Sequence, residues 1–179
     1  MKRSAFTMLE LVFVIIVIGI LAVLAMPNFN RHPLQEATEQ LASHIRYTQH
    51  LAMIDDKFDP ADANWWKRKW QLKITGTSYD VFSDSVTING TVDAGEAAID
   101  PLTKAPISAI NLADKYGITA ITAPATLAFD NMGRPYDDFT TDVYTDIVTA
   151  DTNITLTHDD GTAIITIRPE TGYVSVTYP

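Results

Sequence analysis

The 179-residue sequence contains no cysteine. Disulfides, thiolate metal ligands and cysteine nucleophiles are therefore excluded. The sequence is also poor in positive charge, with 13 Lys and Arg against 22 Asp and Glu and a formal net charge of -9. Binding to nucleic-acid phosphates needs clustered Lys and Arg, so this balance argues against a nucleic-acid-binding protein.

Motifs for catalysis are missing as well. The sequence has no Gly-x-Ser-x-Gly, no phosphate-binding glycine loop and no His-Glu-x-x-His. We therefore expect no enzyme, no cofactor and no metal site. Four aspartates offer the oxygen ligands that calcium prefers, but a solvated acidic loop is the favoured interpretation. They are Asp55, Asp56, Asp59 and Asp62.

Apolar residues are concentrated near the N-terminus. After the basic pair Lys2 and Arg3, the run from Leu11 to Met26 is almost wholly apolar and is broken only by Gly19. As a helix, residues 6–26 would extend roughly 31 Å, enough for a bilayer core. The pattern predicts a transmembrane helix over 6–26, with the basic residues on the cytoplasmic side.

Glu10 helps to decide which kind of membrane or signal segment the apolar run over 6–26 is. An ordinary signal anchor and a secretory signal peptide are the alternatives, since Val23-Leu24-Ala25 ends in residues that a signal peptidase accepts. A buried core helix is disfavoured because the run is so uniformly apolar. A carboxylate near the bilayer centre costs about 2.5–3.5 kcal/mol, and somewhat less near the edge. An ordinary anchor or signal peptide has no reason to carry this cost, so Glu10 is predicted to have a function.

Residues Ser4 to Leu11 read Ser-Ala-Phe-Thr-Met-Leu-Glu-Leu. They resemble the prepilin cleavage and methylation motif of type IV pilins and type II secretion pseudopilins, usually Gly followed by Phe-Thr-Leu-Ile-Glu-Leu. The resemblance implies a leader peptide over 1–5, cleavage between Ala5 and Phe6, and N-methylation of Phe6, with Ala5 where the family usually has Gly. It also implies that Glu10 pairs with the amino terminus of a neighbouring subunit, where opposite charges neutralise each other away from water.

The helix is predicted to continue after a kink at Pro27 as an amphipathic segment over 27–54. It would form one long, interrupted helix from about 6 to 54, with its first half in lipid and its second half packed on a domain. His44 is predicted on the polar side, away from the buried stripe. That stripe consists of Leu34, Ala37, Leu41, Ile45, Thr48 and Ala52.

Residues 55–179 are predicted to form a β-rich globular domain with a loop-rich insertion at about 84–125. The aromatic and basic segment Trp65 to Trp70 could bind nucleic acid or a membrane surface, but the favoured interpretation is that it opens a strand. Alternation there places Trp70, Leu72 and Ile74 inward and Arg68, Gln71 and Lys73 outward. A returning strand is expected at 79–82 after a turn at 76–78.

The C-terminal third predicts a three-stranded antiparallel meander over 153–158, 163–168 and 173–178. Its expected buried residues are Ile154, Leu156, Ile165, Ile167, Val174 and Val176. The segments Phe129 to Pro135 and Ile165 to Val174 are similar to the C-terminal domain of minor pseudopilins of the GspH/FimT type.

Together these features predict an α+β, pilin-like fold in which a long N-terminal helix, transmembrane in its first half, packs on an antiparallel β-sheet. The resemblance implies a single-pass inner-membrane protein with its C-terminal domain outside the cytoplasm, in the periplasm or extracellular, later incorporated into a type II secretion pseudopilus or type IV pilus, as a minor subunit. Implied partners are the prepilin peptidase and N-methyltransferase, other pilin or pseudopilin subunits, the inner-membrane assembly platform and membrane lipid, with no nucleic acid expected. The alternative is a pilin-like tip adhesin or a module that captures a substrate or DNA.

Overall fold

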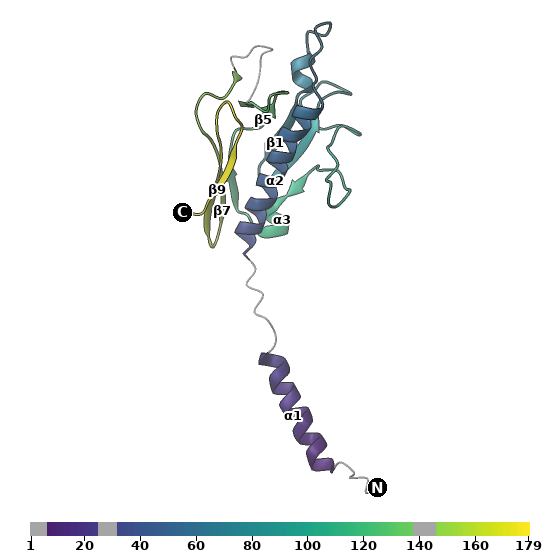
Figure 1. The fold of residues 1–179 in the computed structure, drawn as a ribbon, viewed down its shortest axis with the longest axis vertical. Helices are drawn as coiled ribbons and strands as arrows, with labels where there is room; N and C mark the ends of the chain where they lie inside the picture. The colour runs from purple at the N-terminus through teal and green to yellow at the C-terminus, as the bar shows by residue number, and fades with distance from the viewer. Residues whose placement is uncertain (1–6, 25–31, 138–145) are drawn as a thin grey trace. The chain divides into compact units, whose positions relative to one another are not determined.

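The computed structural model describes residues 7–24, 32–137 and 146–179. The chain divides into two compact units, Met1–Arg31 and His32–Pro179, which we describe in turn. The first contains helix α1 (Met8–Leu24), and the second opens with helix α2 (Pro33–Ile54) (Figure 1).

Helix α1 begins with a local capping arrangement. The Thr7 hydroxyl accepts a hydrogen bond from the Glu10 backbone N–H at 3.3 Å, and the Thr7 carbonyl accepts one from Leu11 at 3.2 Å. The first bond satisfies one of the backbone donors that the first turn of a helix otherwise leaves unpaired, and the second is the first regular hydrogen bond of the helix. Every side chain from Thr7 to Leu21 is exposed.

The predicted transmembrane helix over 6–26 is contradicted. In the described ranges, no helix combines the length and the apolar character needed to cross a membrane. The 17 residues of α1 extend roughly 25 Å, short of a hydrocarbon core of about 30 Å. The predicted span counted Phe6, Ala25 and Met26, which lie outside the described residues. The prediction of a single-pass inner-membrane protein depended on that helix and is corrected with it.

The predicted fold class is wrong in its long, half-transmembrane helix, although the structure is α+β with antiparallel sheets. Two helices are described in place of one: α1 ends at Leu24 and α2 begins at Pro33. A proline is favourable at this first helical position, because it has no N–H to leave unpaired and its φ is already helical.

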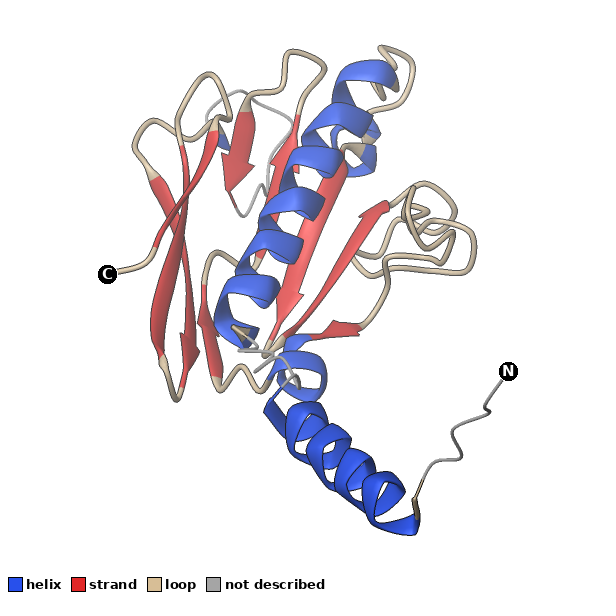
Figure 2. Ribbon diagram, turned by 60° about the horizontal axis from the view of Figure 1, so that its bottom comes forward, coloured by secondary structure: helices blue, strands red, loops and turns tan. Residues whose placement is uncertain are grey.

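Helix α2 lies against two antiparallel sheets in the second unit (Figure 2). The five-stranded sheet has the order β3-β2-β1-β5-β6, and the four-stranded sheet has the order β4-β7-β8-β9. The strands are β1 Trp70–Thr75, β2 Ser78–Ser83, β3 Ile110–Asn111, β4 Ala120–Thr122, β5 Thr126–Phe129, β6 Pro135–Asp137, β7 Thr152–His158, β8 Gly161–Ile167 and β9 Val174–Thr177. A 3-10 helix, η1 (Trp65–Arg68), precedes β1, and the short helix α3 (Leu112–Tyr116) follows β3.

The core forms where the buried stripe of α2 meets both sheets. Leu41 and Ile45 on α2, Leu72 on β1 and Ile165 on β8 all belong to one apolar cluster and have no exposed surface. The helical and strand periodicities predicted for these segments are therefore confirmed. Since a single helix faces both sheets, its stripe is wide, and it also buries Thr38 and His44.

The predicted meander is confirmed in the four-stranded sheet, where β7 pairs with β8 and β8 with β9. Five of its six expected core residues are buried, and Val176 is partly buried against the core. The sheet has one further strand, since β4 pairs with β7 at its edge. This strand comes from the segment that the sequence predicts as loop-rich.

Two details of the first hairpin differ from the prediction. Trp65–Arg68 forms η1 rather than the start of a strand, and β1 begins at Trp70. Gln71, expected to be exposed, is only 4% exposed. It pairs in register with Phe82 and Ala128, both fully buried, on the face opposite to Leu72. The alternation is correct, but this sheet is covered on both faces.

Candidate functional site

The residues predicted for processing and assembly lie near the N-terminus. Ala5, Phe6 and Pro27 fall outside the described residues. Glu10 lies in the first turn of α1 and is exposed. The structure therefore brings no described group together with Glu10 beyond its own capping residue, Thr7.

Two features of α1 define what Glu10 can do. The spacing Thr7-Met8-Leu9-Glu10 is that of a capping box, and a carboxylate at a helix N-terminus is stabilised by the helix dipole. Glu10 is also the only charged residue of α1. The exposed side chains around it are large and apolar: Met8 and Leu9 are each 82% exposed and Phe13 is 68% exposed.

In the second unit, aromatic and charged side chains line a cavity of about 210 Å³. We call it the aromatic pocket. It lies where the end of α2, the segment around η1 and the β5–β6 turn converge. Its lining residues are Ala52, Asp55, Asp56, Lys57, Phe58, Trp65, Lys69, Trp70, Phe129, Asp130, Asn131, Arg134 and Tyr136.

Lys69 is one of the lining residues of the aromatic pocket and is 5% exposed. Its ammonium group lies 3.8 Å from the centre of the Tyr136 ring and 5.1 Å from that of Trp65. Burial lowers the pKa of Lys69, and the nearby carboxylates of Asp130 and Asp146 oppose that shift. The ring faces stabilise the cation in place of water.

Asp130 organises the β5–β6 side of the pocket. One carboxylate oxygen accepts hydrogen bonds from the Met132 and Arg134 backbone N–H groups at 3.0 and 2.9 Å. The other accepts from Arg134 Nε at 2.7 Å and from the Tyr136 hydroxyl at 3.2 Å. With both oxygens engaged, Asp130 fixes the turn and orients the arginine and the tyrosine.

The acidic loop after α2 also contributes to the lining of the pocket. Asp55 accepts a hydrogen bond from the Trp70 indole N–H at 3.0 Å and pairs with Lys57 at 2.5 Å. The hydrogen bond from the Lys57 ammonium has the largest effect and lowers the pKa of Asp55. Burial opposes it, and the hydrogen bond from the Trp70 indole lowers the pKa further. Phe58 packs edge-to-face on Trp65, with ring centres 5.0 Å apart.

The other aspartates of this loop serve local turns. Asp56, Asp59 and Asp62 each accept a hydrogen bond from the backbone N–H two residues later, at 2.9–3.0 Å. Asp62 also pairs with Arg68 at 2.8 Å. Across the described part of the chain, no group of three or more His, Asp or Glu is arranged to hold a metal ion.

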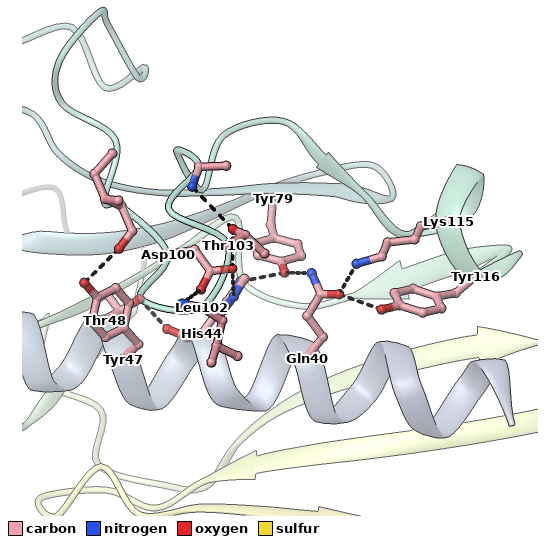
Figure 3. A network of polar contacts seen from close by, with 12 residues as sticks. Gln40, His44, Tyr47, Thr48, Tyr79, Asp100, Leu102, Thr103, Lys115 and Tyr116 are labelled. Atoms are coloured by element: carbon pink, nitrogen blue, oxygen red, sulfur yellow. Dashed lines mark hydrogen bonds and ion pairs between the residues drawn. The ribbon is translucent and has the colours of Figure 1, made fainter.

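A second polar cluster links α2 to β2 (Figure 3). His44 Nδ1 lies 2.8 Å from the Tyr79 hydroxyl, which accepts a hydrogen bond from Gln40 at 3.0 Å. Gln40 Oε1, the oxygen of the same side-chain amide, in turn accepts from Lys115 Nζ and the Tyr116 hydroxyl, both at 2.7 Å. The sequence missed this cluster because a histidine among Gln and Glu residues is typical of a solvated helix face.

Burial determines the chemistry of this cluster. It lowers the pKa of His44, partly offset by the Asp100 carboxylate, whose nearest oxygen is 3.9 Å from Nε2. Burial also raises the pKa of Tyr79. Both rings therefore favour their neutral forms, and the cluster joins α2 to β2 and α3 through hydrogen bonds.

Comparison of the chain with protein-family models, curated proteins and solved structures gives no significant match.

Proposed function

We propose that the chain is a pilin-like structural subunit, cleaved between Ala5 and Phe6 and assembled as a minor component of a helical filament, either a type II secretion pseudopilus or a type IV pilus. Its partners are then the peptidase and N-methyltransferase that process it and the other subunits of the filament.

One observation carries the proposal: no described residue of its own unit covers the apolar surface of α1. Every described side chain from Met8 to Leu21 is exposed, and the helix is apolar on all sides apart from Glu10. A helix that is hydrophobic all round is stable only when other apolar groups cover it. Packing of α1 among equivalent helices of neighbouring subunits supplies that cover.

Such packing makes Glu10 the residue on which assembly depends. Among apolar helices its carboxylate is costly unless a positive charge matches it. Cleavage after Ala5 would release the amino group of Phe6 as a cation, and the same group on a neighbouring subunit would pair with Glu10. The capping position of Glu10 is compatible with this role, because the bond to Thr7 uses its backbone N–H and leaves the carboxylate available.

A second observation supports the choice of a minor subunit. The two segments that resemble minor pseudopilins of the GspH/FimT type lie side by side in the fold. Gln49 Nε2 on α2 donates to the carbonyl oxygen of Gly133 at 2.8 Å and to that of Thr171 at 3.0 Å. The resemblance therefore extends over residues that form one contiguous structural feature.

The test is incorporation of Glu10→Val into filaments. We expect normal amounts of the variant protein in cells and a loss of roughly tenfold or more in sheared filaments, since the neighbour's ammonium has no partner. Glu36→Val is the matched control, because Glu36 is likewise exposed in the first turn of a helix, α2. Normal incorporation of Glu10→Val would refute the role of Glu10.

Processing is tested separately by mass spectrometry of the purified mature protein. The expected N-terminus is Phe6, methylated on nitrogen. A mature chain that begins at Met26 would instead indicate ordinary signal-peptide cleavage and overturn the proposal.

A further inference from the structure

We propose that the aromatic pocket binds one neutral pyranose ring, such as the terminal sugar of a glycan. The proposal does not depend on filament assembly, because the pocket lies wholly within the second unit, His32–Pro179. The size, the charge, the hydrogen-bonding groups and the aromatic rings of the pocket all fit such a ligand.

The size of the pocket limits its ligand to about one ring. Drug-sized ligands occupy pockets of about 300–1,000 Å³, whereas this cavity measures about 210 Å³. A single six-membered sugar ring is within that limit, and a longer glycan could enter only by its end.

The charge of the lining disfavours ions. Three carboxylates, Asp55, Asp56 and Asp130, face three cations, Lys57, Lys69 and Arg134, so the lining carries no net charge. An anionic ligand would meet the carboxylates, and a cationic ligand would meet ammonium groups already placed against Trp65, Trp70 and Tyr136. A neutral polar ligand avoids both costs.

The hydrogen-bonding groups suit hydroxyls. The bonds that the structure gives to Asp55 and Asn131 use Asp55 Oδ2 and Asn131 Nδ2. Among the described residues, this leaves Asp55 Oδ1 and Asn131 Oδ1 as acceptors for a ligand, while the Lys57 ammonium, which pairs with Asp55, is a donor. A hydroxyl both donates and accepts, so adjacent sugar hydroxyls can bridge such a mixed set.

The aromatic rings provide the remaining contact. Phe58 is 57% exposed, and it packs on Trp65 at the same lining. The C–H face of a pyranose is apolar and flat, and it packs on an aromatic ring while the hydroxyls at the ring edge reach polar groups. The pocket therefore offers both surfaces that a sugar requires.

The experiment is a titration of the purified full chain, in a detergent without a sugar head group, with the methyl glycosides of glucose, galactose, mannose and N-acetylglucosamine. Tryptophan fluorescence and saturation-transfer NMR report binding. We expect at least one glycoside to bind saturably with a Kd in the millimolar range. Phe58→Ala should weaken that binding about tenfold, without loss of fold because the ring is largely exposed.

Tyr173→Ala is the matched control, since Tyr173 is an exposed aromatic residue (64%) outside the pocket. It should bind the glycoside as the unchanged chain does.

Asp55→Asn, which removes one carboxylate from the lining, should weaken binding as well. Absence of saturable binding for all four glycosides would overturn the proposal, as would binding that Phe58→Ala leaves unchanged. N-acetylphenylalanine amide serves as a competitor. If it binds in a Phe58-dependent manner and no glycoside does, the pocket takes a peptide side chain and the sugar proposal is wrong.

Discussion

The side-chain amide nitrogen of Gln49 lies 2.8 Å from the carbonyl oxygen of Gly133, to which it donates a hydrogen bond. The same nitrogen donates to the Thr171 carbonyl at 3.0 Å. One residue of α2 thereby joins the turn between β5 and β6 to the turn before β9. Each of those turns belongs to a different sheet, so Gln49 couples the two sheets at this end of α2.

Gly172→Ala should destabilise the second unit through a steric clash at this junction. A Cβ there would lie 2.4 Å from both Gln49 Nε2 and the Gly133 carbonyl oxygen, and the carbonyl belongs to the backbone. Gly76→Ala is the matched control, because its φ of 63° is close to the 61° of Gly172 and nothing lies within 4 Å. The left-handed backbone should cost each variant about 1–2 kcal/mol, and overpacking should cost Gly172→Ala a further 1–3 kcal/mol or so. Urea denaturation measures both, and equal losses would show that the close approach has no energetic consequence.

Ile165→Ala should lower the free energy of unfolding by about 2–5 kcal/mol, because it leaves a cavity in the core. Ile165 has no exposed surface and belongs to the cluster that packs against α2. Leu102→Ala is the control at an 89% exposed position, where a change within about 0.5 kcal/mol is expected. Thermal or urea unfolding distinguishes them, and similar values for the two variants would contradict the assignment of the core.

His44 should make stability depend on pH. Burial lowers its folded-state pKa below the ordinary value of 6.5, so the unfolded chain binds the proton first. The stabilisation is complete above that ordinary value and is lost as pH falls from it toward the folded-state pKa. His44→Gln keeps an amide near Tyr79 but cannot gain a proton, so its stability should fall less between about pH 7 and pH 5.

His50→Gln is the control for this pH dependence, because His50 is exposed on the same helix. Urea denaturation across the pH range gives the slope for each chain. The groups near His44 that could alter the result are Tyr79, Asp100 and Lys115. An identical slope in His44→Gln and the unchanged chain would show that His44 does not take up a proton on unfolding.

Local periodicity in the sequence determined much of the second unit. The 3.6-residue repeat of α2 and the alternation of β7, β8 and β9 each place their apolar residues on one face, and burial of Leu41, Ile45, Ile154 and Ile165 follows. The hairpin of β1 and β2 was predictable for the same reason, since Gly76 adopts the positive φ that its turn requires. These patterns involve neighbours in the chain, so no knowledge of long-range packing was needed.

Only the tertiary structure decided which groups lie together across the chain. Gln71 is buried because the second face of its sheet is also covered, and His44 is buried where the Tyr79 hydroxyl of β2 meets it. No local sequence pattern records either contact. The aromatic pocket likewise draws on three segments, 52–58, 65–70 and 129–136, whose approach depends on the pairing of β1 with β5. The bounds of α1 also differ from the sequence prediction. An apolar run in the sequence shows the composition of a segment, but a membrane span also requires a sufficient helical length, and α1 has 17 residues. The sequence thus determines which residues seek burial, and long-range packing decides what buries them.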